Sequence, residues 1–188
     1  MSRIYIRNIN SFNQPIILND INFKRKEYLE KLKEDSLKKS YYAWLLLKEM
    51  VLEEYNLDID QLTLYYNEFN KPYFKEFCFN ISHSKDLIVV GISNSDIGVD
   101  IQYIDKTKDI DKLAKRINSN NDYYDFYKTF STKEAKSKKI GTGLVLSKLL
   151  EEESVNHQEI ISVDNDEYVL SVSCEETIII QKKGLLRN

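Results

Sequence analysis

A carboxylate and several lysines lie close together in the second half of the chain. Glu134 and Lys138 are four residues apart, so on a helix they face the same side, with Lys133 at the edge of that side. A carboxylate and an ammonium held together in this way could bind a metal-bound polyphosphate. These residues alone also fit a simpler interpretation, in which the glutamate caps a helix and the lysines form a solvated surface.

A second group of polar residues lies upstream. Asp100 and Gln102 occur in the run Gly-Val-Asp-Ile-Gln, which is typical of a strand, where side chains two residues apart share a face. Their oxygens are hard ligands of the kind that Mg²⁺ takes. Ser82 and His83 belong to the preceding run Phe-Asn-Ile-Ser-His-Ser. By itself, a lone histidine at a strand end is more often structural than a ligand.

Taken together and in this order, three segments of the chain resemble the Sfp-type 4′-phosphopantetheinyl transferase family. They are the runs at residues 79–84 and 98–102 and the Lys-Glu-Ala helix at residues 133–144. The resemblance extends from the Lys71-Pro72 turn to Leu144 and is weaker on both flanks. It implies an enzyme of the holo-[acyl-carrier-protein] synthase type, which moves the phosphopantetheine arm of coenzyme A to a serine of an apo acyl- or peptidyl-carrier protein and releases 3′,5′-ADP. The pathway would be fatty acid, polyketide or nonribosomal peptide biosynthesis.

The resemblance also implies roles for individual residues. Glu134 would be the general base for the carrier serine, and Lys138 would stabilise or protonate the departing 3′,5′-ADP. The metal, Mg²⁺ or alternatively Mn²⁺, would be bound by Asp100, Gln102 and Glu134. The contacts with coenzyme A would come from Lys31, Lys71, Ser82, His83 and Lys133.

The chain departs from the family pattern at two places. Gln102 stands where members often have a glutamate, so we expect weaker metal affinity with activity retained. An arginine often found near the position of Ala43 or Trp44 is also missing. These departures motivate an alternative, a catalytically silent relative that binds coenzyme A or a carrier protein without transfer.

The elements that must position these residues follow from apolar spacing and turn residues. Ser131 and Glu134 fit a capping box at the start of the site helix, and Gly141 and Gly143 fit its end. Two strands around the turn at residues 94–96 predict a hairpin. The pattern predicts further helices at residues 22–35, 36–55 and 109–118, and further strands at residues 4–9, 62–66, 77–81, 159–163, 168–173 and 177–181.

A weak internal echo links the strands at residues 87–102 with those at residues 168–181. With the resemblance, it predicts an α+β fold in which two similar halves are related by a pseudo-twofold axis. The halves would be residues 1–104, with the coenzyme A phosphate contacts and the first metal ligand, and residues 105–188, with the base and the carrier contacts. We expect one compact body and a monomer with internal pseudo-symmetry.

Composition excludes several other classes of protein. The 188 residues are 42% hydrophobic and 30% charged, which argues against a disordered chain. No apolar run approaches the roughly 18 residues of a membrane span, and no signal-peptide pattern is present, so we expect a cytoplasmic protein. The net charge of −3 argues against a nucleic-acid binder.

Two further groups of residues are two cysteines and a cluster of aromatic side chains. Cys78 and Cys174 lack the spacing of a metal site or redox pair, which predicts reduced, buried thiols. The aromatic residues at positions 123–127 are candidates for a carrier-docking surface, although such spacing is more often that of a core.

Overall fold

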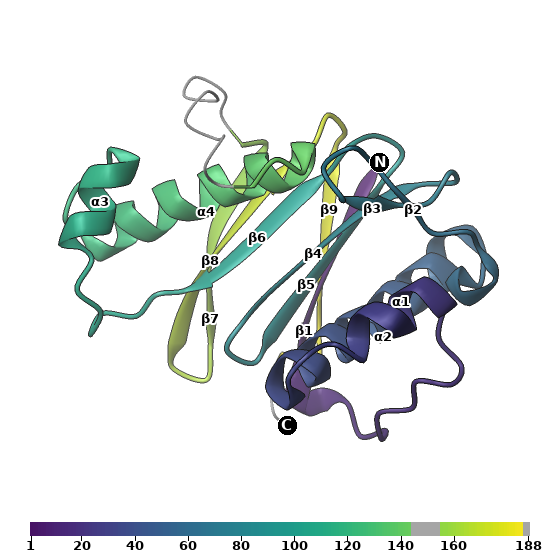
Figure 1. The fold of residues 1–188 in the computed structure, drawn as a ribbon. Helices are drawn as coiled ribbons and strands as arrows, with labels where there is room; N and C mark the ends of the chain where they lie inside the picture. Colours follow the sequence, from purple (N-terminus) through teal and green to yellow (C-terminus); the bar gives the residue numbers. More distant parts are fainter. Residues whose placement is uncertain (144–154, 186–188) are drawn as a thin grey trace.

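The computed structural model describes residues 1–143 and 155–185 and has an α+β architecture (Figure 1). The longer helices of these ranges are α1 (Phe23–Leu29), α2 (Glu34–Tyr55), α3 (Asp111–Ile117) and α4 (Tyr123–Ile140). Short 3₁₀ turns span Ile9–Ser11 and Ile59–Gln61. The sequence also predicts helical or irregular structure at residues 145–153, which lie outside the described residues.

The strands form two main sheets and a small ribbon. The first sheet has the order β4 (Cys78–Ser84), β5 (Leu87–Ser93), β1 (Ser2–Asn8) and β9 (Ile178–Lys183). The second has the order β6 (Gly98–Tyr103), β8 (Asp166–Ser173) and β7 (His157–Val163). The ribbon pairs β2 (Tyr65–Tyr66) with β3 (Pro72–Tyr73). All pairs are antiparallel except β1 with β9, which run parallel.

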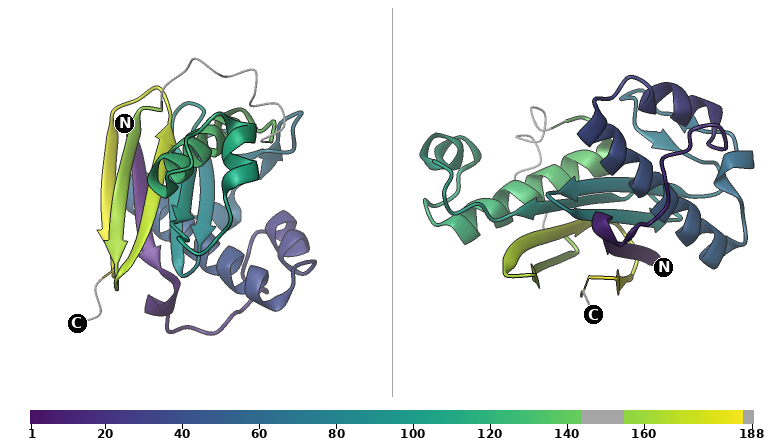
Figure 2. Two further views of the ribbon diagram at one scale, coloured as in Figure 1. Left: turned by 90° about the vertical axis from the view of Figure 1, so that its left-hand side faces the viewer. Right: turned by 90° about the horizontal axis from the view of Figure 1, so that it is seen from below.

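The first sheet is covered on both faces, and its central strand β5, which is mostly apolar, is buried at every position. On β5, Ile88 and Val90 face α2, where they pack in one cluster with Trp44. Val89 points the other way and packs with residues of the second sheet. Trp44 is fully buried against the rings of Phe74 and Phe79, which confirms that it serves packing. In the left view of Figure 2 the helices lie to one side of β7, β8 and β9.

The predicted hairpin at residues 87–103 is wrong. β5 pairs with β4 and β1 in the first sheet. After the turn, the chain passes to the second sheet, where β6 pairs with β8. The last two strands also separate, since β8 stays in the second sheet and β9 joins the first beside β1. Side chains of β5 and β6 meet in the apolar layer between the sheets, so these strands pack by their faces. An apolar strand pattern does not distinguish face packing from edge pairing.

The start of the site helix also differs from the prediction. Helix α4 begins at Tyr123, and its N-cap Asp122 accepts a hydrogen bond from the Asp125 amide. Ser131 lies inside the helix and is buried, so it does not form a capping box. The helix extends further because its aromatic N-terminal turns pack in a cluster with α3. The predicted end is confirmed, since Gly141 caps the helix with φ of 96°.

Several smaller expectations are confirmed. Cys174 is a buried free thiol as expected, whereas Cys78 is a free thiol that is only half-buried. Asn70 adopts positive φ in the turn before Pro72, a conformation that asparagine tolerates better than most residues. Phe126 and Tyr127 are buried in the α3 and α4 cluster, so these two residues form core and not an open docking surface. In residues 1–143 and 155–185 no helix has the length and apolar character to span a membrane.

Candidate active site

The site begins where α4 lies directly on β6. A Cβ atom added to Gly98 would be 1.9 Å from the carbonyl oxygen of Ala135 and 2.4 Å from the amide nitrogen of Lys139. The helix therefore contacts the strand backbone, which only glycine permits at this distance. This close contact brings the face of α4 that carries Glu134 and Lys138 over the polar residues of β6.

Asp100 is the centre of a buried polar network. Its side chain is 1% exposed, and the Nζ atom of Lys138 donates to its Oδ1 at 2.6 Å. The Ser82 hydroxyl donates to the same oxygen at 3.0 Å, and the Gln102 amide donates to Oδ2 at 2.9 Å. Lys138 also donates to Ser82 Oγ at 2.9 Å. The ion pair between Lys138 and Asp100 and the hydrogen bonds of Ser82 thus join α4, β6 and β4.

Glu134 lies half-buried beside this network. Burial raises the pKa of its carboxyl group, the Lys138 ammonium lowers it, and the Asp100 carboxylate raises it again. Within the described residues no hydrogen bond or ion pair holds the Glu134 carboxylate. Two carboxylates therefore share one ammonium, and one of them has a pKa shifted toward that of a proton acceptor at neutral pH.

A cavity of about 240 Å³ opens beside these groups. Its polar lining includes Glu134, Lys138, Asn80 and Ser137, and the turn at residues 69–72 forms another wall. One side of the polar network therefore borders a cavity that a ligand could enter.

Side chains of β4 connect the two sheets at the site. Asn80, Ser82 and Ser84 project from one face of the strand and accept hydrogen bonds from the backbone amides of β6. The partners are Val99 at 3.0 Å, Ile101 at 3.3 Å and Tyr103 at 2.8 Å. His83 is exposed on the opposite face, where partial desolvation and the ammonium groups of Lys39 and Lys138 lower its pKa and Asp35 raises it. The motif therefore has a structural role in positioning Asp100.

Lys71 is 6% exposed and has internal acceptors. Its Nζ atom donates to Asp96 Oδ1 at 3.0 Å, to the Ile97 carbonyl at 3.1 Å and to the Lys139 carbonyl. These bonds tie the turn before β6 to the last turn of α4. The expected phosphate contact of Lys71 stays a prediction, and it requires the release of at least one of these acceptors.

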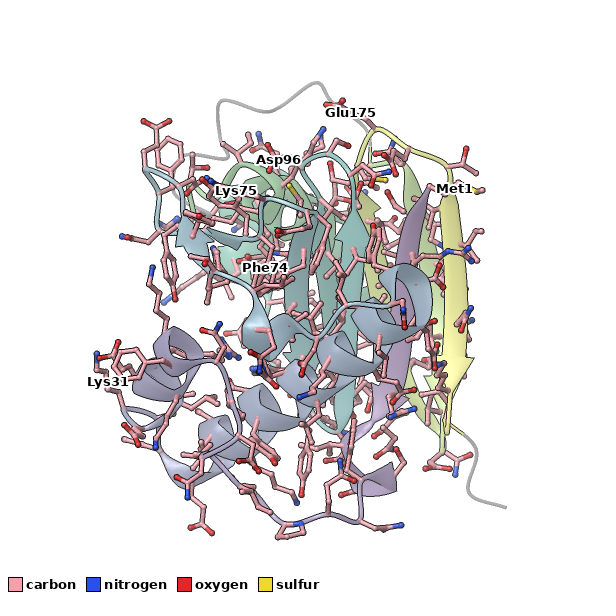
Figure 3. All side chains as sticks on the ribbon, turned by 90° about the vertical axis from the view of Figure 1, so that its right-hand side faces the viewer. Met1, Lys31, Phe74, Lys75, Asp96 and Glu175 are labelled. Atoms are coloured by element: carbon pink, nitrogen blue, oxygen red, sulfur yellow. The ribbon has the colours of Figure 1, made fainter. Side chains whose placement is uncertain are left out.

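The remaining lysines expected to contact phosphate differ in position. Lys31 is exposed after α1, and Figure 3 shows it at the margin of the helical layer, well apart from Asp96. Lys133 is half-buried on α4, and within the described residues it has no ion pair. The structure thus groups Ser82, Asp100, Gln102, Glu134 and Lys138, whereas Lys31 lies elsewhere.

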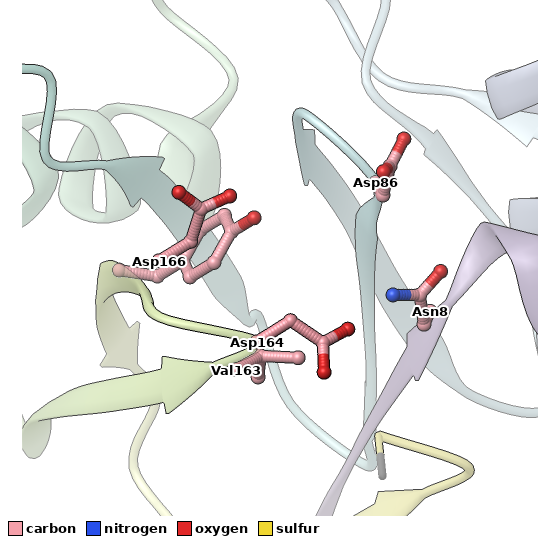
Figure 4. Close-up of a pocket in the computed structure, with 6 residues that line it drawn as sticks. Asn8, Asp86, Val163, Asp164 and Asp166 are labelled. Atoms are coloured by element: carbon pink, nitrogen blue, oxygen red, sulfur yellow. The ribbon is translucent and has the colours of Figure 1, made fainter. Parts of the chain in front are cut away.

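A second cavity, of about 350 Å³, lies at the turn between β7 and β8 (Figure 4). Asp86, Asp164 and Asp166 line it together with Asn8. Asp166 accepts hydrogen bonds from Lys85 at 3.0 Å. None of the residues expected to act in catalysis or binding lines this cavity.

Comparison with known proteins gives three related enzymes. A 4′-phosphopantetheinyl transferase of Bacillus subtilis is 33% identical over 117 residues, which cover 54% of this chain and 51% of the relative. The transferase gsp of Aneurinibacillus migulanus is 29% identical over 121 residues, 57% and 50% of the two chains. The transferase psf-1 of Bacillus pumilus is 30% identical over 116 residues, 53% and 48%.

The chain is a distant relative of 4′-phosphopantetheinyl transferases. It spans about half the length of the curated relatives it matches. No family model matches the sequence. The resemblance inferred from the sequence is therefore confirmed, and the activity of the whole protein is a proposal.

The donor set fits the divalent ion that a phosphopantetheinyl transferase would use. In the part of the chain that the structure describes, no three His, Cys, Asp or Glu side chains are grouped to hold a metal. Mg²⁺ requires only one or two carboxylates, with water and substrate phosphate completing its shell, and Asp100 and Glu134 would be the two available here. Gln102 presents its amide nitrogen to Asp100, and rotation of the amide would present its oxygen instead.

Sequence reasoning missed three residues that position the site. Gly98 had no assigned role although it sets the distance between α4 and β6. Asn80 and Ser84 support the backbone of β6. The available signal was the alternation of small polar side chains along β4, which is unusual for a strand buried between other elements.

Proposed function

We propose that the protein is a Mg²⁺-dependent 4′-phosphopantetheinyl transferase that acts on apo acyl- or peptidyl-carrier proteins and coenzyme A. The observation that carries the proposal is the cluster of Glu134, Asp100 and Lys138 beside a cavity. It occurs in a chain that is similar to such transferases over about half its length. Either carboxylate alone would fit a structural ion pair.

The proposed reaction needs a proton acceptor and charge stabilisation. The carrier serine oxygen forms a bond to the phosphorus that carries the pantetheine arm, and the bond from this phosphorus to the bridging oxygen breaks. Glu134 takes the serine proton, and its raised pKa favours that role. Lys138 faces the negative charge that develops on the departing 3′,5′-ADP. When bound to Asp100, Gln102 and Glu134, Mg²⁺ or Mn²⁺ would withdraw charge from the phosphate oxygens.

We also propose a pseudo-twofold body with halves at residues 1–104 and 105–188. Support comes from the two strand exchanges, because β5 leads from the first sheet to β6 in the second and β8 leads back to β9 in the first. Each half therefore contributes strands to both sheets. Such an exchange favours a single compact monomer over two independent domains.

The test is the mass of a carrier protein. The purified protein is incubated with coenzyme A, Mg²⁺ and a panel of apo carriers, and each carrier is analysed by intact mass spectrometry. We expect one carrier to gain the mass of the phosphopantetheine arm, and a chelator to abolish the gain. A carrier whose acceptor serine is replaced by alanine is the control.

The second candidate is a silent relative that binds coenzyme A or a carrier without transfer. Gln102 favours it, because a neutral amide offsets less metal charge than the glutamate often found there. The same experiment separates the two candidates. Binding of coenzyme A or a carrier without a mass gain in any carrier would support the silent relative.

A further inference from the structure

We propose that Lys138 is the resident cation of Asp100, and that a divalent ion must displace its ammonium before it can bind this carboxylate. The inference rests on the metal site of the proposed function and adds a competition within it. Metal affinity would then be set by Lys138 as well as by the metal ligands.

The first support is the geometry of Asp100. Both of its oxygens are occupied, Oδ1 by Lys138 and Ser82 and Oδ2 by Gln102. The carboxylate is 1% exposed, so water cannot replace a lost partner from outside. A buried carboxylate without its counter-charge is strongly destabilised. An approaching ion therefore finds Asp100 already neutralised, and it gains this ligand only by breaking a 2.6 Å ion pair.

The second support is the place to which Lys138 can move. Its side chain is 29% exposed and lines the cavity next to Glu134. The amine also donates to Ser82 Oγ at 2.9 Å, a partner that remains when Asp100 is taken by an ion. Displacement thus requires that this flexible side chain turn away from Asp100 toward the cavity that it lines.

The third support is the charge of the cluster. Asp100, Glu134 and Lys138 together carry one net negative charge when all three are ionised. A divalent ion on the two carboxylates changes this to one net positive charge and releases an ammonium beside the cavity. The site would therefore attract a polyphosphate only after metal is bound, which gives an ordered loading with metal first.

Gln102 makes this exchange possible in a stable protein. As a neutral donor it satisfies Asp100 Oδ2 at 2.9 Å, whereas a glutamate there would add a third carboxylate around one lysine. Without a metal, Asp100 is therefore neutralised by the ion pair with Lys138, and its second oxygen accepts a hydrogen bond from the Gln102 amide. The same amide can turn its oxygen toward an ion.

The experiment measures metal binding in the absence of coenzyme A and carrier. Mn²⁺ is titrated into the full chain, and free Mn²⁺ is followed by electron paramagnetic resonance. Lys138→Met removes the competing charge, and we expect Mn²⁺ to bind about tenfold more tightly or better, since the ion then no longer breaks a buried pair. The matched control is Lys128→Met on the same helix, for which we expect a change of less than about twofold.

A second variant covers the case in which Lys138→Met does not fold. Lys138→Gln is neutral but can still donate hydrogen bonds to Asp100 and Ser82, and it should also bind Mn²⁺ more tightly than the native chain. Circular dichroism checks that each variant is folded. We further expect Mn²⁺ to raise the melting temperature of both neutral variants more than that of the native chain.

Each outcome decides the inference. Equal affinity in the native chain and the neutral Lys138 variants would overturn it, as would an equal gain in Lys128→Met. No Mn²⁺ binding to any of these proteins would overturn both the inference and the metal site. Tighter Mn²⁺ binding by the Lys138 variants, in a protein that loads no carrier, would support the inference and remove only the proposed transferase activity.

Discussion

Glu134 and Asp100 illustrate how burial assigns different roles to two carboxylates. Asp100 has hydrogen-bond partners on both oxygens and an ammonium at 2.6 Å. Glu134 has neither among the described residues, and burial raises its pKa. A carboxylate with partners on both oxygens is held in one position, whereas a carboxylate with a raised pKa and no such partners is the better candidate for a proton acceptor.

The first prediction concerns Glu134. Replacing it by glutamine keeps the size of the side chain and removes the proton acceptor, so carrier loading should fall by about 10²- to 10⁴-fold. The measurement is the initial rate of mass gain of an apo carrier with saturating coenzyme A and Mg²⁺. Glu175→Gln, which changes an exposed carboxylate paired with Lys139, is the control and should retain the native rate. Near-native turnover of Glu134→Gln would reject the assignment of the base.

The second prediction concerns the pH dependence of stability through His83. Its pKa is lowered in the folded protein by burial and by the ammonium groups of Lys39 and Lys138, against a smaller opposing effect of Asp35. The unfolded chain therefore binds the proton more readily, and the native protein should lose stability as the pH falls below about 6.5.

His83→Gln removes this titration. We expect the difference in melting temperature between the native chain and the variant to be constant above about pH 7.5 and to shift against the native chain toward about pH 5. Thermal unfolding across this range checks it. Parallel curves at all pH values would show that His83 is not destabilised by protonation.

At the scale of elements, the position of α4 on β6 depends on a single residue without a side chain. Gly98 lies against the backbone of Ala135 and Lys139, and Ser131 on the same helix donates to the Asp100 carbonyl at 3.4 Å. The helix thus contacts the strand backbone both at Gly98 and at Asp100. Any change that separates the two backbones also separates Lys138 from Asp100.

The third prediction is that Gly98→Ala destabilises the protein by about 3 kcal/mol or more, because the new methyl group overlaps helix backbone that cannot move alone. Urea denaturation measures the loss. Gly143→Ala is the matched control: nothing lies within 4 Å of its added Cβ, so only its positive φ opposes the substitution, at about 1 kcal/mol. Equal costs at the two glycines would contradict the role of Gly98.

The fourth prediction tests the hydrogen bonds from β4 to β6. Ser84→Ala removes the acceptor of the Tyr103 amide, which lies 2.8 Å from Ser84 Oγ. We expect a loss of about 1 kcal/mol, since the amide is left without its partner. Ser36→Ala, at an exposed position of α2, should change stability by less than about 0.5 kcal/mol. A neutral effect of Ser84→Ala would mean that the apolar layer alone aligns the sheets.

At the scale of the whole molecule, the last strand completes the first sheet. β9 pairs in parallel with β1 from Ser2 to Arg7. Lys183 on β9 also forms ion pairs with Glu49 and Glu53 of α2. The two ends of the described chain therefore close one body, and β1 is a central strand only while β9 is present.

The fifth prediction follows from this closure. A chain that ends at Glu176 leaves the backbone of β1 without partners on one edge, and we expect loss of several kcal/mol of stability or of cooperative unfolding. Urea denaturation followed by circular dichroism checks it. Lys182→Ser keeps the strand and removes only an exposed ion pair with Glu159, so it should cost less than about 1 kcal/mol. A truncated chain as stable as Lys182→Ser would show that β9 is dispensable.

The sequence by itself determined most of the helices and strands and the resemblance to a known family. Apolar spacing located α2 and the strands of the two main sheets to within a few residues but missed the short strand β3, Gly141 marked the end of α4, and the order of three short motifs indicated the family. These features depend on neighbours along the chain, where the helical and strand periods are strict. The candidate residues Asp100, Glu134 and Lys138 were chosen from the same motifs.

Only the tertiary structure decided which strands pair and what the polar groups contact. β5 and β6 form no hairpin because their apolar faces pack between two sheets, and α4 begins early because its aromatic residues pack with α3. The same packing lets the Lys71 ammonium donate hydrogen bonds to backbone carbonyls and pairs Lys138 with Asp100. The strength of an ion pair depends on its burial and on its other partners, and these are properties of the folded chain.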